Sequence, residues 1–438
     1  MLLYIDNFNT CRYYNGVIIL YLKLIFLIIH IRDMGVNDLN QITIGCKTYK
    51  GRFNTIIIDG SNLLFTSLTS VVSRMRKENS KVIGDVKVID SPILTQFSDI
   101  IDSATNYIIA DINTFKRMLI NQKNMFITID SPKPIYKFSN GETLDLKAEE
   151  QERRKKNNDR DSIINNNIAK LKLTSDDDEQ FQKLFNEFIQ LDYFNNMKNL
   201  VGLSEIIIQQ VMKRVKDVQF IKTVSEADLI IRALASCYNY DTVLVCSNDT
   251  DYFVLTGDLP NVYKTDVYNH RDIFYPKKIW QTKMFDTITF KDISIISTIL
   301  GNDYTGKQKL MVYNIEYLRA LYNVNNSFSI LLNSKVKKIK PFLTNLKIEQ
   351  DKITNSDELI KLCSINNVFV RSIRMYEDCD MNTDFVKYPM LDIDALYQEK
   401  LLKLCDNLQI SQDNYKPHVF DDVVHSEFIN SSDFSSED

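Results

Sequence analysis

The sequence predicts an α/β fold in which a mostly parallel, twisted sheet is flanked by helices. Three short apolar runs, at residues 54–59, 124–130 and 242–246, stop abruptly at polar residues. Buried parallel strands end in this way when their carboxyl ends open onto a site. Because stretches of helical composition separate the three runs, strands and helices alternate along the chain, and this order is typical of a parallel sheet.

The remaining elements follow from apolar spacing and from cap signals. Shorter strands are predicted at 217–221 and 261–264. Helices are predicted at 62–72, 100–119, 180–194, 204–216, 226–238 and 292–300, with helical composition also at 147–173, 313–321 and 357–363.

Composition excludes several classes of protein. The 438 residues are 44% hydrophobic and 25% charged, as in a soluble globular protein. The seven cysteines are scattered without a Cys-x-x-Cys pair, which indicates reduced thiols inside a cell and argues against a zinc site. The net charge of −4 argues against a nucleic-acid partner, but the acids are concentrated at 176–179 and after 420, whereas 153–156 are all basic.

Acidic residues follow the predicted strands. Asp249 and Asp251 lie two apart after the run at 242–246, and Asp59 and Asp130 end the other two runs. Carboxylates held close together repel one another unless a proton or a cation lies between them, and hard divalent cations prefer oxygen ligands. The alternative interpretation of Asp249 and Asp251 is a solvated turn.

Three further acids occupy predicted element ends. Glu226 and Asp228 begin a helix, where the alternative is a capping box with Ser225. Asp303 follows Gly301, where the alternative is a turn residue that caps the next helix. All seven acids are explained if they line one pocket for two Mg²⁺ or Mn²⁺ ions, which serve phosphodiester hydrolysis without a histidine base. The four histidines lie far from these acids, so a Ser-His-Asp arrangement is not expected.

Taken in order, these segments resemble the flap endonuclease/XPG family of structure-specific 5′ nucleases. The blocks that carry the resemblance, between Met34 and Tyr304, are IIIDGSN, FITIDSPKP, VSEADLI, CSNDTDYFVL and LGNDY. The resemblance implies a 5′-nuclease-like (PIN-like) sheet and two metal positions. It assigns Asp59, Asp130, Glu226 and Asp228 to the first metal, and Asp249, Asp251 and Asp303 to the second, with Asp228 shared.

The resemblance also implies DNA contacts. Met34-Gly35 matches the family's start, so we expect translation to begin at Met34 and the apolar leader 1–33 to lie outside the fold; a short membrane anchor at 17–31 is the alternative. Phe65 occupies the position of a base-stacking tyrosine, and a core aromatic is the alternative. Lys137, Arg153 and Arg154 match basic catalytic positions, and Lys147 compensates for a missing arginine. A helical arch is then expected at about 147–194; the alternative is a solvated charged helix.

The chain departs from the family after Tyr304. Residues 305–310 hold no Gly-x-Gly turn for a helix-hairpin-helix, and no sliding-clamp motif follows. Divergent members from large DNA viruses, poxviruses among them, are the most similar, which implies a host nucleus or a cytoplasmic viral replication site.

The expected organisation is a nuclease domain at 34–304, a mainly helical region at 305–420 and an acidic disordered tail at 421–438. The expected function is a monomeric, Mg²⁺-dependent nuclease that acts on 5′ flaps, nicks or branches in DNA replication, recombination or repair, without stable membrane association. The alternative is a non-catalytic scaffold that binds branched DNA. A phosphatase of the haloacid-dehalogenase type is disfavoured because Asp59-Gly60-Ser61 lacks its Asp-x-Asp.

Overall fold

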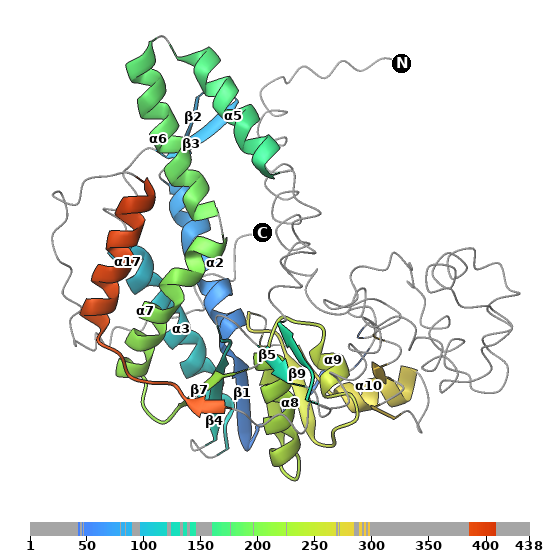
Figure 1. Cartoon of the computed structure of the whole chain (residues 1–438). Helices are drawn as coiled ribbons and strands as arrows, with labels where there is room; N and C mark the ends of the chain where they lie inside the picture. The colour runs from blue at the N-terminus through green and yellow to red at the C-terminus, as the bar shows by residue number, and fades with distance from the viewer. Residues whose placement is uncertain are drawn as a thin grey trace, which may run out of the picture. The chain divides into compact units, whose positions relative to one another are not determined.

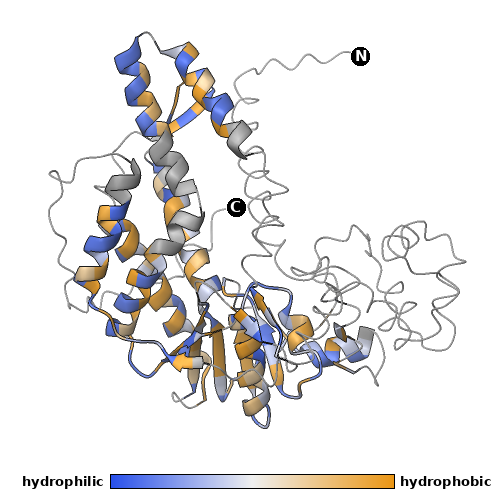
Figure 2. Cartoon of the chain, in the orientation of Figure 1, coloured by the Kyte–Doolittle hydropathy of each residue, from blue (hydrophilic) through white to orange (hydrophobic). Residues whose placement is uncertain are grey.

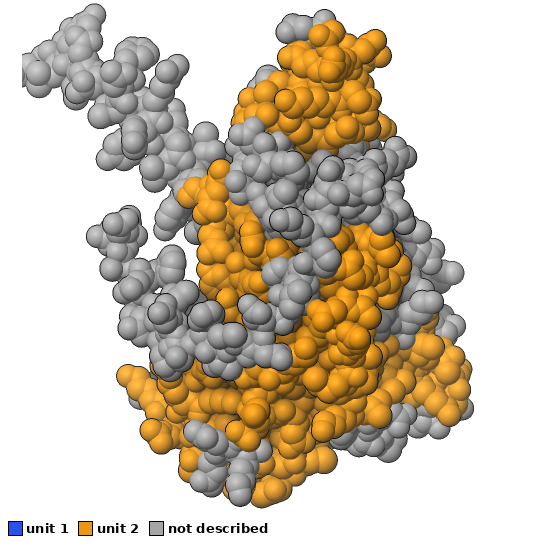
Figure 3. Space-filling view, turned by 90° about the vertical axis from the view of Figure 1, so that its left-hand side faces the viewer, with its two compact units in different colours: residues 1–49, 247–379 blue, residues 50–246, 380–438 orange. Residues whose placement is uncertain are grey.

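The chain divides into two compact units, of which Figure 3 shows unit 2 in orange. Unit 1 comprises residues 1–49 and 247–379, and unit 2 comprises residues 50–246 and 380–438. The computed structural model describes residues 43, 46, 48–78, 80–83, 85–89, 97–120, 124–131, 135–137, 141–145, 160–175, 177–195, 197–224, 226–268, 270, 272–283, 289–290, 293–294, 297 and 385–408.

Unit 2 contains a sheet in which four neighbouring strands are parallel. In sheet order the strands are β8 (Val243–Cys246), β1 (Thr55–Asp59), β4 (Met125–Ile129), β7 (Gln219–Thr223) and the antiparallel edge strand β11 (Phe385–Lys387). Every residue of β1, β4 and β8 is buried, and Figure 2 shows their apolar character. This arrangement confirms the predicted α/β fold with a mostly parallel sheet flanked by helices.

Helices cover this sheet and fix its connections (Figure 1). The helices α2 (Gly60–Glu78), α3 (Phe97–Met118) and α7 (Met197–Arg214) pack together, and α2 also contacts β1 and β4. Helix α8 (Ala227–Tyr238) packs on β1, β4 and β8. The chain runs from β1 to β4 to β7 in one direction, and α8 then returns it to β8. Because such crossovers are right-handed, the return places α8 on the opposite face and makes a topological switch point between β1 and β8.

Helix α2 starts in close contact with the neighbouring strand. A Cβ atom on Gly60 would lie 2.6 Å from Ile127 Cγ2 and 2.7 Å from the Thr128 carbonyl oxygen. Glycine is therefore required where β1 turns directly into α2. The helix was predicted at 62–72 but runs from Gly60 to Glu78. Its second half is mostly polar, but the buried side chains of Val71 and Val72 anchor it to the core.

A second, smaller assembly in unit 2 is built around a hairpin that sequence reasoning left unplaced. Strands β2 (Ser80–Ile83) and β3 (Val86–Ile89) form an antiparallel hairpin, and α5 (Arg160–Thr174) and α6 (Asp178–Asn195) pack against it. Helix α6 confirms the helix predicted at 180–194, and the Asp177 carboxylate caps it by accepting the Gln180 N–H at 2.7 Å. The part of the predicted arch at 147–159 lies outside the described residues.

The described C-terminal segment returns to unit 2. Helix α17 (Ile393–Leu408) packs on α6 and α7. The buried side chain of Gln209 donates to the Pro389 carbonyl oxygen at 2.9 Å and accepts the Leu391 N–H at 3.0 Å. Tyr388, whose N–H donates to the Phe220 carbonyl, is 5% exposed. These contacts attach the segment to α7 and to the edge of the sheet.

Unit 1 contains the antiparallel pair β9 (Val262–Thr265) and β10 (Ile273–Phe274), with helices α9 (Tyr252–Leu255) and α10 (Pro276–Lys283). The indole N–H of Trp280 donates to the Phe253 carbonyl oxygen at 2.6 Å and joins α10 to α9. A Cβ on Gly257 would lie 2.8 Å from that same oxygen, so the turn after α9 also requires glycine.

Several sequence expectations differ from the structure by a few residues. Helix α7 starts at Met197 rather than 204, and β7 occupies 219–223 rather than 217–221 because Asp217 has a φ of 65° that interrupts extended backbone. The leader 1–33, most of the helix predicted at 292–300, and the helices predicted at 313–321 and 357–363 lie outside the described residues. Within the part of the chain that the structure describes, no helix combines the length and hydrophobicity needed to span a bilayer.

We predict that Gly60→Ala destabilises the protein by about 1–3 kcal/mol, because the new methyl group forces α2 away from the Thr128 carbonyl. Urea unfolding followed by circular dichroism measures the loss. Ser73→Ala, on the same helix, is the control and should change stability by less than about 0.5 kcal/mol. Equal midpoints for the two variants would contradict the close approach.

We predict that the C-terminal segment detaches in alkali. Burial, and secondarily the charge of Glu205, raise the pKa of Tyr388 to about 12 from an ordinary value of 10.0. The folded chain thus favours the neutral phenol, so this contribution to stability is complete below pH 10 and is lost as the pH rises from about 10 to about 12.

Limited proteolysis of residues 385–408 across this pH range tests the prediction. Tyr388→Phe keeps the ring and removes the ionisation, so it should delay detachment. Tyr240→Phe, at a position that is 72% exposed, should behave like the unmodified chain. If proteolysis of the Tyr388→Phe variant and of the unmodified chain depended on pH in the same way, ionisation of Tyr388 would not explain the detachment.

Candidate metal centre

The first predicted acid ends the central strand of the sheet. Asp59 is the last residue of β1 and is 5% exposed. Its Oδ1 accepts the backbone N–H of Asn62 at 2.9 Å, in the first turn of α2. The carboxylate thus satisfies one of the N–H groups that have no partner within the helix, and the positive end of the helix dipole favours its charge.

Asp130 joins three elements of unit 2. Its N–H donates to Ser61 Oγ at 3.0 Å, which links the end of β4 to the start of α2. Its Oδ1 accepts the N–H of Ala227, the first residue of α8, at 2.6 Å. Three hydrogen bonds in series therefore connect the end of β1, the end of β4 and the beginning of α8.

The acids at the start of α8 lie beside this connection. Glu226 is the N-cap residue, with extended backbone and no side-chain cap hydrogen bond, and Asp228 lies in the first turn. The capping-box alternative predicted Ser225 as the cap with Asp228 as its partner. The structure instead assigns the N-cap to Glu226, and the carboxylate that caps the helix comes from Asp130 on a different element.

Lys137 lies on a short hairpin that begins near the same sheet edge. It ends β5 (Ile135–Lys137), which pairs with β6 (Thr143–Asp145), and its side chain is exposed. The Ile135 N–H contacts the carbonyl oxygen of Val224, directly after β7, at 3.4 Å. The hairpin therefore starts where β7 ends, two residues before Glu226.

Asp249 and Asp251 lie in a tight, buried loop of unit 1. They are 7% and 4% exposed. The Asp249 N–H donates to Ser247 Oγ at 3.1 Å, and Asp249 Oδ1 accepts the Asp251 N–H at 2.9 Å. Asn248 Oδ1 accepts the Val267 N–H at 2.8 Å and fixes the loop beside β9. A solvated Asp-rich turn, the alternative considered for these residues, is inconsistent with this burial.

The carboxylate oxygens are chemically suited to Mg²⁺ or Mn²⁺, but the described side chains do not form a ready-made cage. Among the residues that the structure describes, no three His, Cys, Asp or Glu side chains are grouped closely enough to hold a metal ion. Gly35, Lys147, Arg153, Arg154 and Asp303 lie outside these residues. Phe65 is half-buried on α2.

Sequence reasoning missed the residues that connect the acids. Ser61 and Asn62 were noted only as a turn and helix-start signal. The physical signal was available, because a Ser two residues after a strand-ending Asp often lies in the first turn of a helix, where its hydroxyl can reach a neighbouring loop. The bond from Ser61 to Asp130 needs the β1–β4 register, Asp59 with Thr128, which single-sequence patterns do not specify.

No protein-family model and no curated protein sequence matches the chain. Solved structures with similar folds include human GEN1 in complex with Holliday junction DNA, at a TM-score of 0.40 and 13% identity over 85% of this chain and 74% of that one. Zinc-bound T5 5′-exonuclease gives a TM-score of 0.36 and 12% identity, and bacteriophage T5 flap endonuclease in a complex with DNA and metal ions gives 0.35 and 13%; both cover 81% of this chain and 98% of theirs. TM-scores and sequence identities this low do not assign an activity to this chain.

We predict that Ser61→Ala leaves the half-buried Asp130 N–H without its acceptor and destabilises the protein by about 1–3 kcal/mol. Hydrogen exchange of the Asp130 amide should accelerate in Ser61→Ala and return towards normal in Ser61→Thr, which keeps the hydroxyl.

The control is Thr128→Val. The Thr128 hydroxyl donates to the Ile58 carbonyl at 3.3 Å and bridges β1 and β4 just before the Ser61–Asp130 bond. The change to valine removes this hydroxyl. It should lower stability without accelerating exchange at Asp130. Unchanged exchange at Asp130 in Ser61→Ala would show that the serine does not hold the loop.

Proposed function

We propose that the chain is a structure-specific 5′ nuclease that hydrolyses phosphodiester bonds in DNA with two divalent metal ions. The observation that supports this most directly is the series of hydrogen bonds through Asp59, Ser61 and Asp130 to the first residue of α8. These bonds connect Asp59 and Asp130, at the carboxyl ends of the adjacent parallel strands β1 and β4, to the start of α8, and open α/β sheets bind ligands beside such strand ends.

Two sets of ligands are proposed. Asp59, Asp130, Glu226 and Asp228 would hold the first ion, and Asp249, Asp251 and Asp303 would hold the second, with Asp228 shared. When bound, such ions lower the pKa of a coordinated water and stabilise the charge on the attacking and leaving oxygens.

The protein's own groups have separate tasks. The N–H groups of Asn62 and Ala227 each hold one oxygen of a carboxylate and so fix its orientation. Burial of Asp249 and Asp251 removes competing water from their loop. Lys137, exposed on β5, and the basic residues Arg153 and Arg154 are proposed to contact the scissile phosphate, where a cation stabilises developing negative charge.

The substrate proposed is DNA with a 5′ flap, nick or branch. Helices α5 and α6 occupy residues 160–174 and 178–195 of the predicted arch, through which a single-stranded 5′ end would pass. Gly35, Phe65 and Lys147 are proposed substrate contacts. The domain organisation given by the sequence, with a nuclease domain at 34–304, stays part of this proposal.

A second function is a scaffold that binds branched DNA without cutting it. One observation favours it: the described carboxylates do not gather into a group of three. The two functions differ in whether bound cations draw these acids together, so metal-dependent turnover distinguishes them.

The test is cleavage of 5′-flap, nicked and branched DNA by the full chain with Mg²⁺ or Mn²⁺. Asp130→Asn retains an oxygen that accepts the Ala227 N–H but loses the charge, so α8 should stay capped while cleavage falls by at least about 100-fold. Asp130→Ala should lose both cleavage and stability. A fully active Asp130→Asn would contradict the proposed ligand set.

A matched pair flanks β8. Asp249→Asn should lower cleavage by at least about 100-fold. Asp241→Asn, an exposed acid at the opposite end of the same strand, should leave cleavage unchanged. Tight binding of branched DNA without cleavage under either cation would favour the scaffold function instead.

A further inference from the structure

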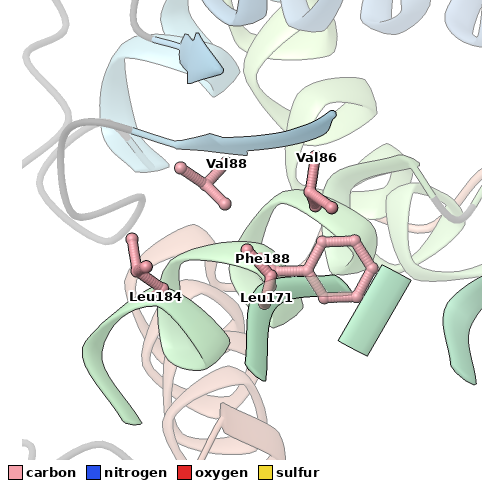
Figure 4. Close-up of a cluster of buried hydrophobic side chains, with 5 residues drawn as sticks. All are labelled: Val86, Val88, Leu171, Leu184 and Phe188. Carbon is pink, nitrogen blue, oxygen red and sulfur yellow. The ribbon is translucent and has the colours of Figure 1, made fainter. Parts of the chain in front are cut away.

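Unit 2 contains a second hydrophobic core that is separate from the sheet. Five buried side chains form it, from the β3 strand and from both α5 and α6: Val86, Val88, Leu171, Leu184 and Phe188 (Figure 4). Partly buried Ile83, Ile164, Ile168 and Phe181 pack around them. The β2–β3 hairpin, inserted between α2 and α3, thus shares a core with helices that follow it by some seventy residues of sequence or more.

The spacing of these residues shows that all three elements point their apolar faces at one another. On α5 the positions 164, 168 and 171 form one stripe, and on α6 the positions 181, 184 and 188 form another. On β3 the buried Val86 and Val88 alternate with exposed Lys87. The opposite face of the hairpin carries Val82, which is 64% exposed.

An ion pair fixes the hairpin along α6. Lys81 Nζ lies 3.3 Å from Glu187 Oε2, with the two side chains 34% and 16% exposed. A partly exposed pair of this kind adds little stability, but it favours one position of β2 along α6 over its neighbours.

Helix α5 depends on this packing. It has 15 residues, and isolated helices of that length are marginal in water. Its packing partners are α6 and β3. Helix α6 also packs on α7 and α17, and within the part of the chain that the structure describes the hairpin gives α5 a second support besides α6.

We propose that the β2–β3 hairpin holds α5 and α6 in position before DNA binds, which makes Val86 and Val88 positioning residues. This proposal rests on the proposed function for the role of α5 and α6 as the arch that receives a single-stranded 5′ end. If the arch is ordered in only a fraction of the DNA-free molecules, the apparent affinity for DNA falls in proportion to that fraction. Helices α5 and α6, held in position by the hairpin, avoid this loss of affinity for DNA.

The test compares the double variant Val86→Ala/Val88→Ala with Val82→Ala. Both remove methyl groups from valines of the same hairpin, but only the first removes them from the shared core. Without DNA, amide hydrogen exchange in residues 160–195 should accelerate by about tenfold or more in the double variant, and exchange in β1 and β4 should not change. Val82→Ala should match the unmodified chain.

Binding of a 5′-flap DNA, with Ca²⁺ in place of Mg²⁺, should restore slow exchange in the double variant. In steady-state cleavage with Mg²⁺, a competent fraction reduced to about one tenth raises KM about tenfold, while kcat stays within about twofold. A merely structural loss would instead lower the active fraction and reduce kcat without this rescue by DNA.

Unchanged exchange in 160–195 in the double variant overturns the proposal, and so does a fall in kcat with constant KM. The exchange comparison needs no catalysis. An unmodified chain that cuts no DNA therefore contradicts the proposed function, while exchange in the absence of DNA still decides whether the hairpin holds the helices.

Discussion

The hydrogen bond from the Ala227 N–H to Asp130 is the contact on which the candidate site depends. At 2.6 Å it fixes the start of α8 to the end of β4, and Ser61 fixes the same loop to the start of α2. The β1–β4 register aligns the two strand-ending acids, and these bonds also join the start of α8 and the start of α2 to the loop that follows β4. With them, the ends of two parallel strands and the beginning of a helix form one connected edge.

The same carboxylates therefore have a structural task in addition to the proposed one. Asp59 and Asp130 each accept an N–H from a helix start, where the helix dipole favours negative charge. This lowers the cost of holding acids at a largely buried sheet edge, because each carboxylate exchanges water for a charge-assisted hydrogen bond. Gly60 contributes because a Cβ atom there would lie only 2.7 Å from the Thr128 carbonyl oxygen, so its absence lets α2 begin close to β4, where Ser61 reaches Asp130.

The sequence predicted the parallel sheet because β1, β4 and β8 are buried on both faces and read as near-continuous apolar runs. It did not predict the β2–β3 hairpin, although Gly84-Asp85 between two alternating runs is a hairpin signal, because the surrounding residues are polar. Strand β11 could not be predicted: three residues gain their strand character only from the exposed edge of β7. The strand-ending acids Asp59 and Asp130 could be predicted from their place after apolar runs, whereas the connecting role of Ser61 depends on register.

Two features thus organise unit 2: a hydrogen-bonded edge that connects Asp59 and Asp130 to the start of α8, and a small apolar core that joins the hairpin to α5 and α6. In the proposed function, the acids of this edge act together on bound cations. A crystal structure of the full chain grown with Mn²⁺, examined by anomalous scattering, tests it most directly. We expect two peaks about 3.5–4 Å apart, with oxygen ligands from Asp59, Asp130 and Glu226 or Asp228 at the first. Fully ordered side chains at these positions in saturating Mn²⁺, with no peak beside them, would contradict it.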